Sequence, residues 1–124
     1  MNSIDKRIYV RSLLAFRCLP FHISFYKEIQ KKGLDSEVVF QSKNKYCVKG
    51  QNWFSYAQDI EESFCWLIKL GILRREVDGQ GLTSKIRLTP LGRQILDKEP
   101  WIPSQKANFF EKIKYYFYRN FELR

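Results

Sequence analysis

Hydrophobic residues that recur three and four positions apart predict helices over much of the chain. Residues 4–18, 22–32 and 52–70 show this spacing, which places their apolar side chains on one helical face. Pro20 ends the first segment, because proline lacks a backbone N–H and biases the preceding residue away from helix. Gly33 is expected to end the second in a left-handed conformation. The longest segment has a clear buried face, formed by Phe54, Ala57, Ile60, Phe64, Leu67 and Ile68.

An alternating pattern follows Gly71 and predicts a β-hairpin. Residues 72–77 and 83–88 form the expected strands, and the loop 78–81 supplies residues that tolerate the positive φ of a hairpin turn. Arg75 shares the inward parity of the first strand, so it must lie near the sheet edge or emerge at the hairpin base. The alternation places four residues on the core side: Leu73, Val77, Ile86 and Leu88. It points five residues outward: Arg74, Glu76, Thr83, Lys85 and Arg87.

The remaining segments have weaker patterns. Residues 38–40 predict a short strand, and 46–48 are a candidate partner for it. A side-chain cap followed by a proline, Thr89-Pro90, begins a helix that ends near Asp97. A final helix is expected over 104–121, with a broad apolar side formed by Phe109, Phe110, Ile113, Phe117 and Phe121.

Charge adds a functional constraint to this pattern. The chain has 124 residues, the size of one domain, with 22 Lys and Arg against 13 Asp and Glu and a formal charge of +9. This favours a polyanionic partner, either nucleic acid or an anionic membrane surface. No apolar run approaches the roughly 20 residues that span a bilayer, and no signal peptide is visible, so a cytoplasmic protein is expected. Three widely spaced cysteines are expected to be free thiols: Cys18, Cys47 and Cys65.

Catalytic and metal sites are not expected. His22 is the single histidine and is most simply a helix-start residue, and no Cys/His cluster has metal-ligand spacing. The loop 78–81 lacks the Gly-Lys-Ser/Thr that completes a phosphate-binding loop. The acidic run of Asp59, Glu61 and Glu62 is expected to be a solvated helix face. We therefore expect no enzymatic activity, no cofactor, no metal and no small-molecule ligand.

The hairpin is the strongest functional signal. Its outward cations and small polar residues suit contacts to phosphates or to a minor groove. The alternative is a solvated hairpin whose charges only prevent its edges from pairing with another chain. The candidate contact residues are Arg74, Gln80, Thr83, Ser84, Lys85 and Arg87.

The start of the helix over 52–70 is the second candidate contact region. A helix in the major groove generally reads bases with its N-terminal residues, and Asn or Gln can pair with adenine edges. The acidic run one turn later would be repelled by phosphates, so we expect the hairpin to contribute more than the helix. The candidate residues here are Lys43, Lys45, Lys49, Gln51, Asn52, Ser55 and Tyr56.

The final helix over 104–121 has three possible roles: a contact between two copies of the chain, packing within one chain, or association with a membrane surface. The dimer is favoured and the membrane least favoured, because a broad aromatic stripe is too large to leave exposed on a soluble monomer. A dimer would also place two hairpins along one duplex.

Two stretches resemble a known family: Leu67-X-X-Leu70-Gly-Ile-Leu and, after a turn with glycines, Arg87-Leu-Thr-Pro-Leu-Gly-Arg93. They are similar to the helix–wing–helix segment of winged-helix transcriptional regulators, over residues 52–97. The whole chain also resembles a group of small cyanobacterial winged-helix proteins associated with heterocyst differentiation. The resemblance implies duplex DNA binding through the helix start and the wing.

The expected fold is therefore α+β, mainly α: a winged helix over 1–99 with a small antiparallel hairpin wing, and an added C-terminal helix over 100–124 that forms a dimer. The expected function is a DNA-binding transcriptional regulator without enzymatic activity. A non-catalytic protein–protein adaptor on the same scaffold is the alternative, because fold alone does not fix function.

Overall fold

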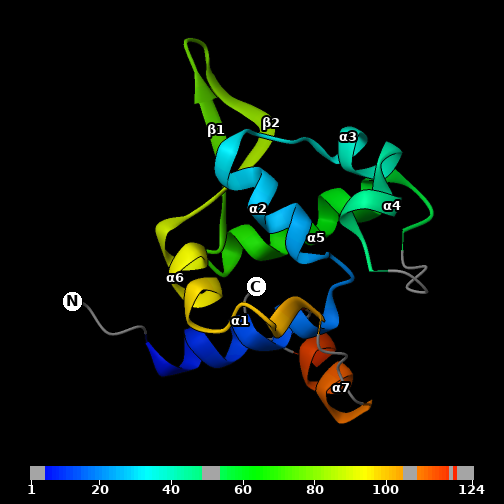
Figure 1. Cartoon of the computed structure of the whole chain (residues 1–124), viewed down its shortest axis with the longest axis vertical. Helices are drawn as coiled ribbons and strands as arrows, with labels where there is room; N and C mark the ends of the chain where they lie inside the picture. The colour runs from blue at the N-terminus through cyan, green and yellow to red at the C-terminus, as the bar shows by residue number, and fades with distance from the viewer. Residues whose placement is uncertain (1–4, 49–53, 105–108, 118, 120–124) are drawn as a thin grey trace.

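The computed structural model describes residues 5–48, 54–104, 109–117 and 119 (Figure 1). These residues are mainly helical with one small antiparallel sheet, which confirms the expected α+β, mainly α class. The order is α1 (Lys6–Cys18), α2 (Ile23–Lys31), α3 (Ser36–Gln41), α4 (Lys43–Tyr46), α5 (Ala57–Lys69), β1 (Leu73–Asp78), β2 (Gly81–Leu88), α6 (Pro90–Lys98), the 3-10 turn η1 (Ile102–Ser104) and α7 (Phe109–Phe117).

An aromatic cluster forms the centre of the core. Phe25 of α2 stacks on Phe21 and on Phe64 of α5, with ring centroids 4.5 Å and 5.7 Å away. Tyr26 packs edge-on against Phe16 of α1 at 5.0 Å. All five side chains are fully buried. Because each aromatic pair adds roughly 0.5–1.5 kcal/mol beyond its buried area, this cluster holds α1, α2 and α5 together.

The predicted first helix and the predicted end of the longest helix are confirmed. Asp5 caps α1 by accepting the N–H of Arg7 at 2.9 Å. Gly71 follows α5 with φ +85, and the N–H of Ile72 donates to the carbonyl of Leu67 at 2.9 Å. This pattern is a Schellman motif, in which a left-handed residue lets the chain turn out of the helix and into β1.

Gly33 was expected to be left-handed, and this expectation is wrong. The glycines with positive φ among the described residues are Gly71 and Gly81, and α2 instead ends at an extended Lys32. Gly33 is needed for a different reason. A Cβ built on it would lie 2.6 Å from Oε2 of Glu76 and 2.9 Å from Cβ of Lys85, so the hairpin passes too close for a side chain.

The strand predicted over 38–40 is also wrong. These residues belong to helix α3, because the side chain of Asp35 accepts the N–H of Val38 at 2.9 Å and starts a helical turn. Val39 is then fully buried. Residues 46–48 pair with the segment before α2 instead, through a bridge between Cys47 and Phe21.

Helix α5 begins at Ala57, five residues later than predicted. The carboxylate of Asp59 accepts the N–H groups of Ser55 and Tyr56, each at 3.0 Å. An acidic residue in the first turn satisfies N–H groups that have no partner inside the helix, so Asp59 sets this boundary. The predicted helical positions 52 and 53 lie outside the described residues.

The hairpin lies where it was predicted, but its turn is shorter than the predicted loop 78–81, because Asp78 pairs with Gly81 and leaves residues 79 and 80 as the turn. Gly81 has φ +118 at the turn, and Leu73, Ile86 and Leu88 are buried as expected. The pairing Leu73↔Leu88 and Arg75↔Ile86 changes register before Val77↔Leu82, so β2 carries a bulge. Val77 was placed on the core side, and this is wrong: it is 62% exposed. The hairpin projects beyond the helices at the top of Figure 1, so its outer residues lie past the core.

The base of the hairpin is attached to the body by a backbone bridge. The N–H of Ile86 donates to the carbonyl of Leu34 at 2.9 Å, and the N–H of Leu34 donates back at 3.3 Å. Both side chains are buried. The residue that follows α2 and Gly33 therefore adds a single antiparallel rung to β2.

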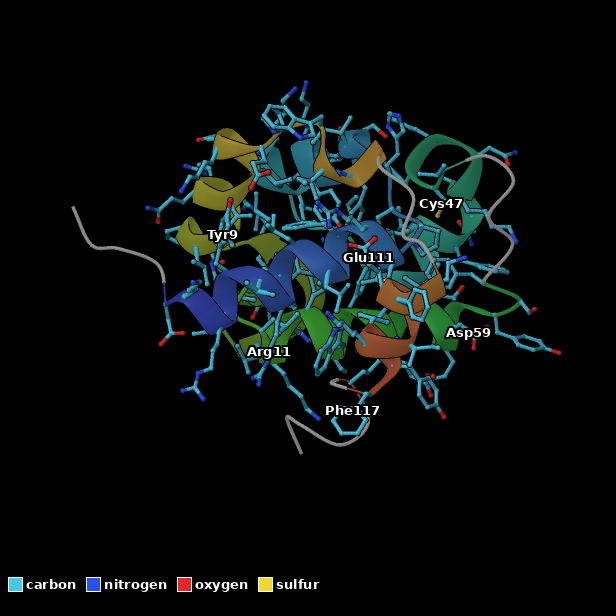
Figure 2. All side chains as sticks on the ribbon, turned by 90° about the horizontal axis from the view of Figure 1, so that it is seen from below. Tyr9, Arg11, Cys47, Asp59, Glu111 and Phe117 are labelled. Carbon is cyan, nitrogen blue, oxygen red and sulfur yellow. The ribbon has the colours of Figure 1, made fainter. Side chains whose placement is uncertain are left out.

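Helix α7 packs within the chain by one face. Tyr115 is buried edge-on against Trp66 of α5 at 6.1 Å, and Glu111 pairs with Arg17 of α1 at 2.6 Å. Figure 2 shows α7 beside the C-terminal half of α1. Three residues of the predicted apolar side are exposed in the single chain, namely Phe110, Ile113 and Phe117. The side chain of Phe109 and all of Phe121 lie outside the described structure.

Helix α6 packs closely on the start of the hairpin. The hydroxyl of Thr89 accepts the N–H of Gly92 at 3.0 Å and donates to the carbonyl of Ile72 at 2.9 Å. A Cβ on Gly92 would lie 2.7 Å from that same carbonyl oxygen. Glycine at this position therefore lets the first turn of α6 rest on the backbone that leads into β1.

We expect Gly92→Ala to lower the free energy of unfolding by about 1–3 kcal/mol, because the backbone oxygen of Ile72 must move. Urea unfolding measures this change. Gly79→Ala is the matched control, since a Cβ there meets nothing within 4 Å. A Gly92→Ala protein more stable than the native one, as helix propensity alone would give, would contradict the close contact.

Candidate nucleic-acid interface

Four of the six hairpin residues proposed from the sequence are exposed. They are Arg74 on β1, Gln80 at the turn, and Ser84 and Lys85 on β2. Thr83 is half-buried, and its hydroxyl donates to the carbonyl of Glu76 at 2.9 Å across the bulge. The hairpin therefore exposes two cations and two polar side chains, while Thr83 stabilises the bulge between its strands.

Arg87 does not face outward, and that prediction is wrong. Its Nε donates to the carbonyl of Ile29 at 2.9 Å, and its Nη2 donates to the carbonyl of Gln30 at 2.9 Å. Its Nη1 pairs with the carboxylate of Glu76 at 3.1 Å. These are carbonyls at the end of α2, where a cation is favoured by the helix dipole. Arg87 therefore fixes the hairpin to α2.

Arg75 was expected to lie near the sheet edge or to emerge at the hairpin base. In the structure its side chain is paired with an acid of α5. Its Nη2 pairs with the carboxylate of Glu61 on α5, and its Nη1 donates to the carbonyl of Ser84 at 3.0 Å. The side chains of Arg75 and Glu61 are 20% and 25% exposed. One cation thus joins β1, β2 and α5.

These contacts change the meaning of the acidic run on α5. The run was expected to be a solvated face, which is wrong for Asp59 and Glu61. Asp59 accepts two backbone N–H groups, Glu61 pairs with Arg75, and Glu62 alone of the three is exposed. The carboxylates of Asp59 and Glu61 are thus partly neutralised by hydrogen-bond donors and a cation of the same protein. The repulsion expected between α5 and a phosphate backbone is therefore reduced.

The segment before α5 holds both exposed and structural candidates. Ser55 is exposed and Tyr56 is 72% exposed, so both side chains are accessible beside the helix start. Lys43 is half-buried, donates to the carbonyl of Phe54 at 3.1 Å and lies over the ring of Phe40, so it holds the loop. Lys45 is exposed. Three further candidates lie outside the described residues: Lys49, Gln51 and Asn52.

The chain belongs to the Npun_F0494-like family. The model of this family matches residues 2–119, which includes the hairpin, every described helix and the loop before α5. Neither the comparison with curated proteins nor the comparison with solved structures gave a match. The family's description names neither an activity nor a fold.

The single histidine and the three cysteines are the remaining candidates for site chemistry in this family member. His22 begins α2, where its Nδ1 accepts the N–H of Ser24 at 3.1 Å, so it is the helix-start residue expected. All three cysteines are free, and burial raises the pKa of Cys18 to about 12 and that of Cys47 to about 11. Within the described ranges, no group of three or more His, Cys, Asp or Glu side chains is placed to hold a metal. Nor is any helix there long and apolar enough to cross a membrane.

We expect Arg87→Ala to lower the free energy of unfolding by roughly 1–2 kcal/mol, because two carbonyls of α2 and the carboxylate of Glu76 lose a charged partner. Arg74→Ala removes the same type of side chain from an exposed position of the paired strand and should change it by less than about 0.5 kcal/mol. Urea unfolding of both variants is the measurement. Equal effects would show that Arg87 is not a structural residue.

Proposed function

We propose that this chain binds duplex DNA as a winged-helix regulator, with β1 and β2 as the wing. The observation that carries the proposal is the placement of charge. The exposed cations Arg74 and Lys85 lie on a fixed hairpin beside α5, and two acids of α5 are bonded within the protein. A basic projection of this kind is suited to the phosphate backbone, which supplies most non-specific affinity.

The order of the elements supports the winged-helix assignment. Helix α5, the hairpin β1–β2 and helix α6 follow one another directly, as the resemblance of residues 67–93 implies. Helix α3 packs against α5, as the first helix of a helix-turn-helix packs against its recognition helix. In this assignment α5 is the recognition helix and its first residues approach the base edges.

The residues divide into two groups by their contacts. Arg74 and Lys85 neutralise phosphates, with Gln80 and Ser84 at the groove edge and Ser55 and Tyr56 near the bases. Arg87, Thr83 and Lys43 position these groups through hydrogen bonds within the chain. The proposed phosphate contact therefore comes from Arg74 and not from Arg87, which strand alternation had placed on the outward face.

We also propose that two copies assemble through α7. Its exposed residues include Phe110 at 74%, Ile113 at 51% and Phe117 at 53% exposure. Figure 2 shows the Phe117 ring at the outer edge of the molecule. Contiguous apolar surface of this kind is typical of an interface between protein chains. A symmetric pair would present two wings to one duplex, as a regulator of a palindromic site requires.

We expect the double variant Arg74→Ala/Lys85→Ala to bind duplex DNA more weakly, with a flatter salt dependence. Each lost phosphate contact should lower the slope of log K against log salt by about 0.9, and lower affinity roughly tenfold at about 0.1 M salt. Fluorescence anisotropy over a salt series measures both quantities.

The charge-matched control is Lys6→Ala/Arg7→Ala. These residues are exposed on α1, at the end of the molecule opposite the hairpin in Figure 1. Equal losses in the two double variants would mean that net charge, not the hairpin, governs binding. A native protein that does not bind duplex DNA at low salt would leave the adaptor function as the better account.

We expect sedimentation equilibrium of the native protein to give twice the chain mass of 14.9 kDa. Ile113→Asp should shift the mass to that of a monomer, because burying an unpaired carboxylate in an apolar interface is costly. Lys112→Asp changes an exposed residue of α7 that helical spacing places away from Phe110, Ile113 and Phe117, and it should leave the dimer intact. A native monomer, or a dimeric Ile113→Asp protein, would contradict assembly through α7.

A further inference from the structure

The outer end of the hairpin holds an apolar pair. Val77 of β1 and Leu82 of β2 are directly paired across the strands, and they are 62% and 75% exposed. Directly paired residues share one face of a hairpin, so the two side chains form one small apolar surface. Leu82 has the largest exposed fraction of the large hydrophobic side chains among the described residues.

The charged groups of the hairpin lie mainly on the face opposite this pair, where Glu76 and Lys85 both approach Gly33. Glu76 is paired with Arg87, and the carboxylate of Asp78 accepts the N–H of Gln80 at 2.7 Å in the turn. Arg74 and Lys85 are exposed on the strands nearer the body. From its tip toward the body, the hairpin therefore carries a polar turn, an apolar pair on one face, and two exposed cations on the other face. A polyanion that also offers an apolar contact, and that the end of the hairpin enters, would meet both.

The hairpin is held as a rigid projection. Thr83 and Arg75 bond across the two strands, through the carbonyls of Glu76 and Ser84. Arg75 also joins α5, and Ile86 is paired with the backbone of Leu34. A side chain that separates two stacked base pairs must resist the force that restores stacking, and these contacts provide that support.

We propose that Leu82, supported by Val77, is an apolar wedge that enters the minor groove, partly unstacks one base step and bends the duplex. This inference rests on the proposed DNA binding. Proteins that bind the minor groove with Arg, Lys, Asn or Gln frequently insert apolar wedges between base steps. The hairpin has Leu82 exposed near its tip, and Arg74 and Lys85 exposed nearer the body. Pyrimidine–purine steps unstack most easily, so the wedge should favour TA over GC at the point of insertion.

The experiment uses a duplex of about 25 base pairs, which is well below the persistence length of about 150. It carries a fluorophore pair at its ends and 2-aminopurine at a central TA step. Native protein should raise energy transfer between the ends and raise the 2-aminopurine fluorescence, and both signals should be smaller with a central GC step beside the probe.

The deciding variant is Leu82→Ala. It should lose both signals and the TA preference, while the salt slope of binding stays unchanged because no phosphate contact is removed. Leu82→Met keeps a long apolar side chain and should keep both signals. Since Leu82 is 75% exposed, neither change should unfold the protein, which circular dichroism can check.

The outcomes separate this inference from the proposed function. Binding without bending, or bending that persists in Leu82→Ala, overturns the wedge and leaves DNA binding intact. Absence of duplex binding by the native protein overturns both. Capture of the native protein but not Leu82→Ala by vesicles of anionic phospholipid, with no bending of DNA, would make the pair a lipid contact and also overturn the wedge.

Discussion

The attachment of the hairpin base to the end of α2 is the constraint on which the rest of the structure depends. The backbone bridge between Leu34 and Ile86 sets the position of β2, and Arg87 ties the same strand to the last carbonyls of α2. Gly33 lets the strands pass without a side chain between them and the helix. With the base fixed in this way, the outer half of the hairpin projects as a rigid arm.

The ion pairs then decide which charges are available to a partner. Two arginines of the hairpin are used within the protein, Arg75 with Glu61 and Arg87 with Glu76. Each pair removes an acid as well as a cation from the exposed surface, so the remaining surface of the hairpin is more uniformly basic than its sequence indicates. In the proposed DNA binding, the net charge of +9 accounts for a polyanionic partner, and the ion pairs leave Arg74 and Lys85 as the exposed cations of the hairpin.

The sequence pattern predicted correctly those elements whose structure is determined by residues close together in the chain. The hairpin after Gly71 and the cap at Thr89 depend on neighbouring residues, and the structure has both, with the turn shortened from residues 78–81 to residues 79 and 80. Residues 38–40 have strand propensity, but the cap from Asp35 and the burial of Val39 favour a helix. Tertiary packing of this kind commonly overrides propensity.

The position of the hairpin was predictable from the sequence, but the contacts of its side chains were not. Parity predicts on which face of a strand a residue lies, but Arg87 has a side chain long enough to reach α2 from that face. Glycine is required at position 33 because Glu76, more than forty positions away in the sequence, passes close to it. A local sequence pattern cannot show such a contact. The signal for the start of α5 was present in Asp59, because an acidic residue is favoured in the first turn of a helix.

The most direct measurement of the central claim is a solution NMR titration of the native protein with a short duplex. The account predicts that the amide signals of Arg74, Lys85 and Tyr56 shift first and most, with those of α1 and α6 little changed. Large shifts confined to α1, α6 or α7, or no shifts at low salt, would contradict binding through the hairpin and the start of α5.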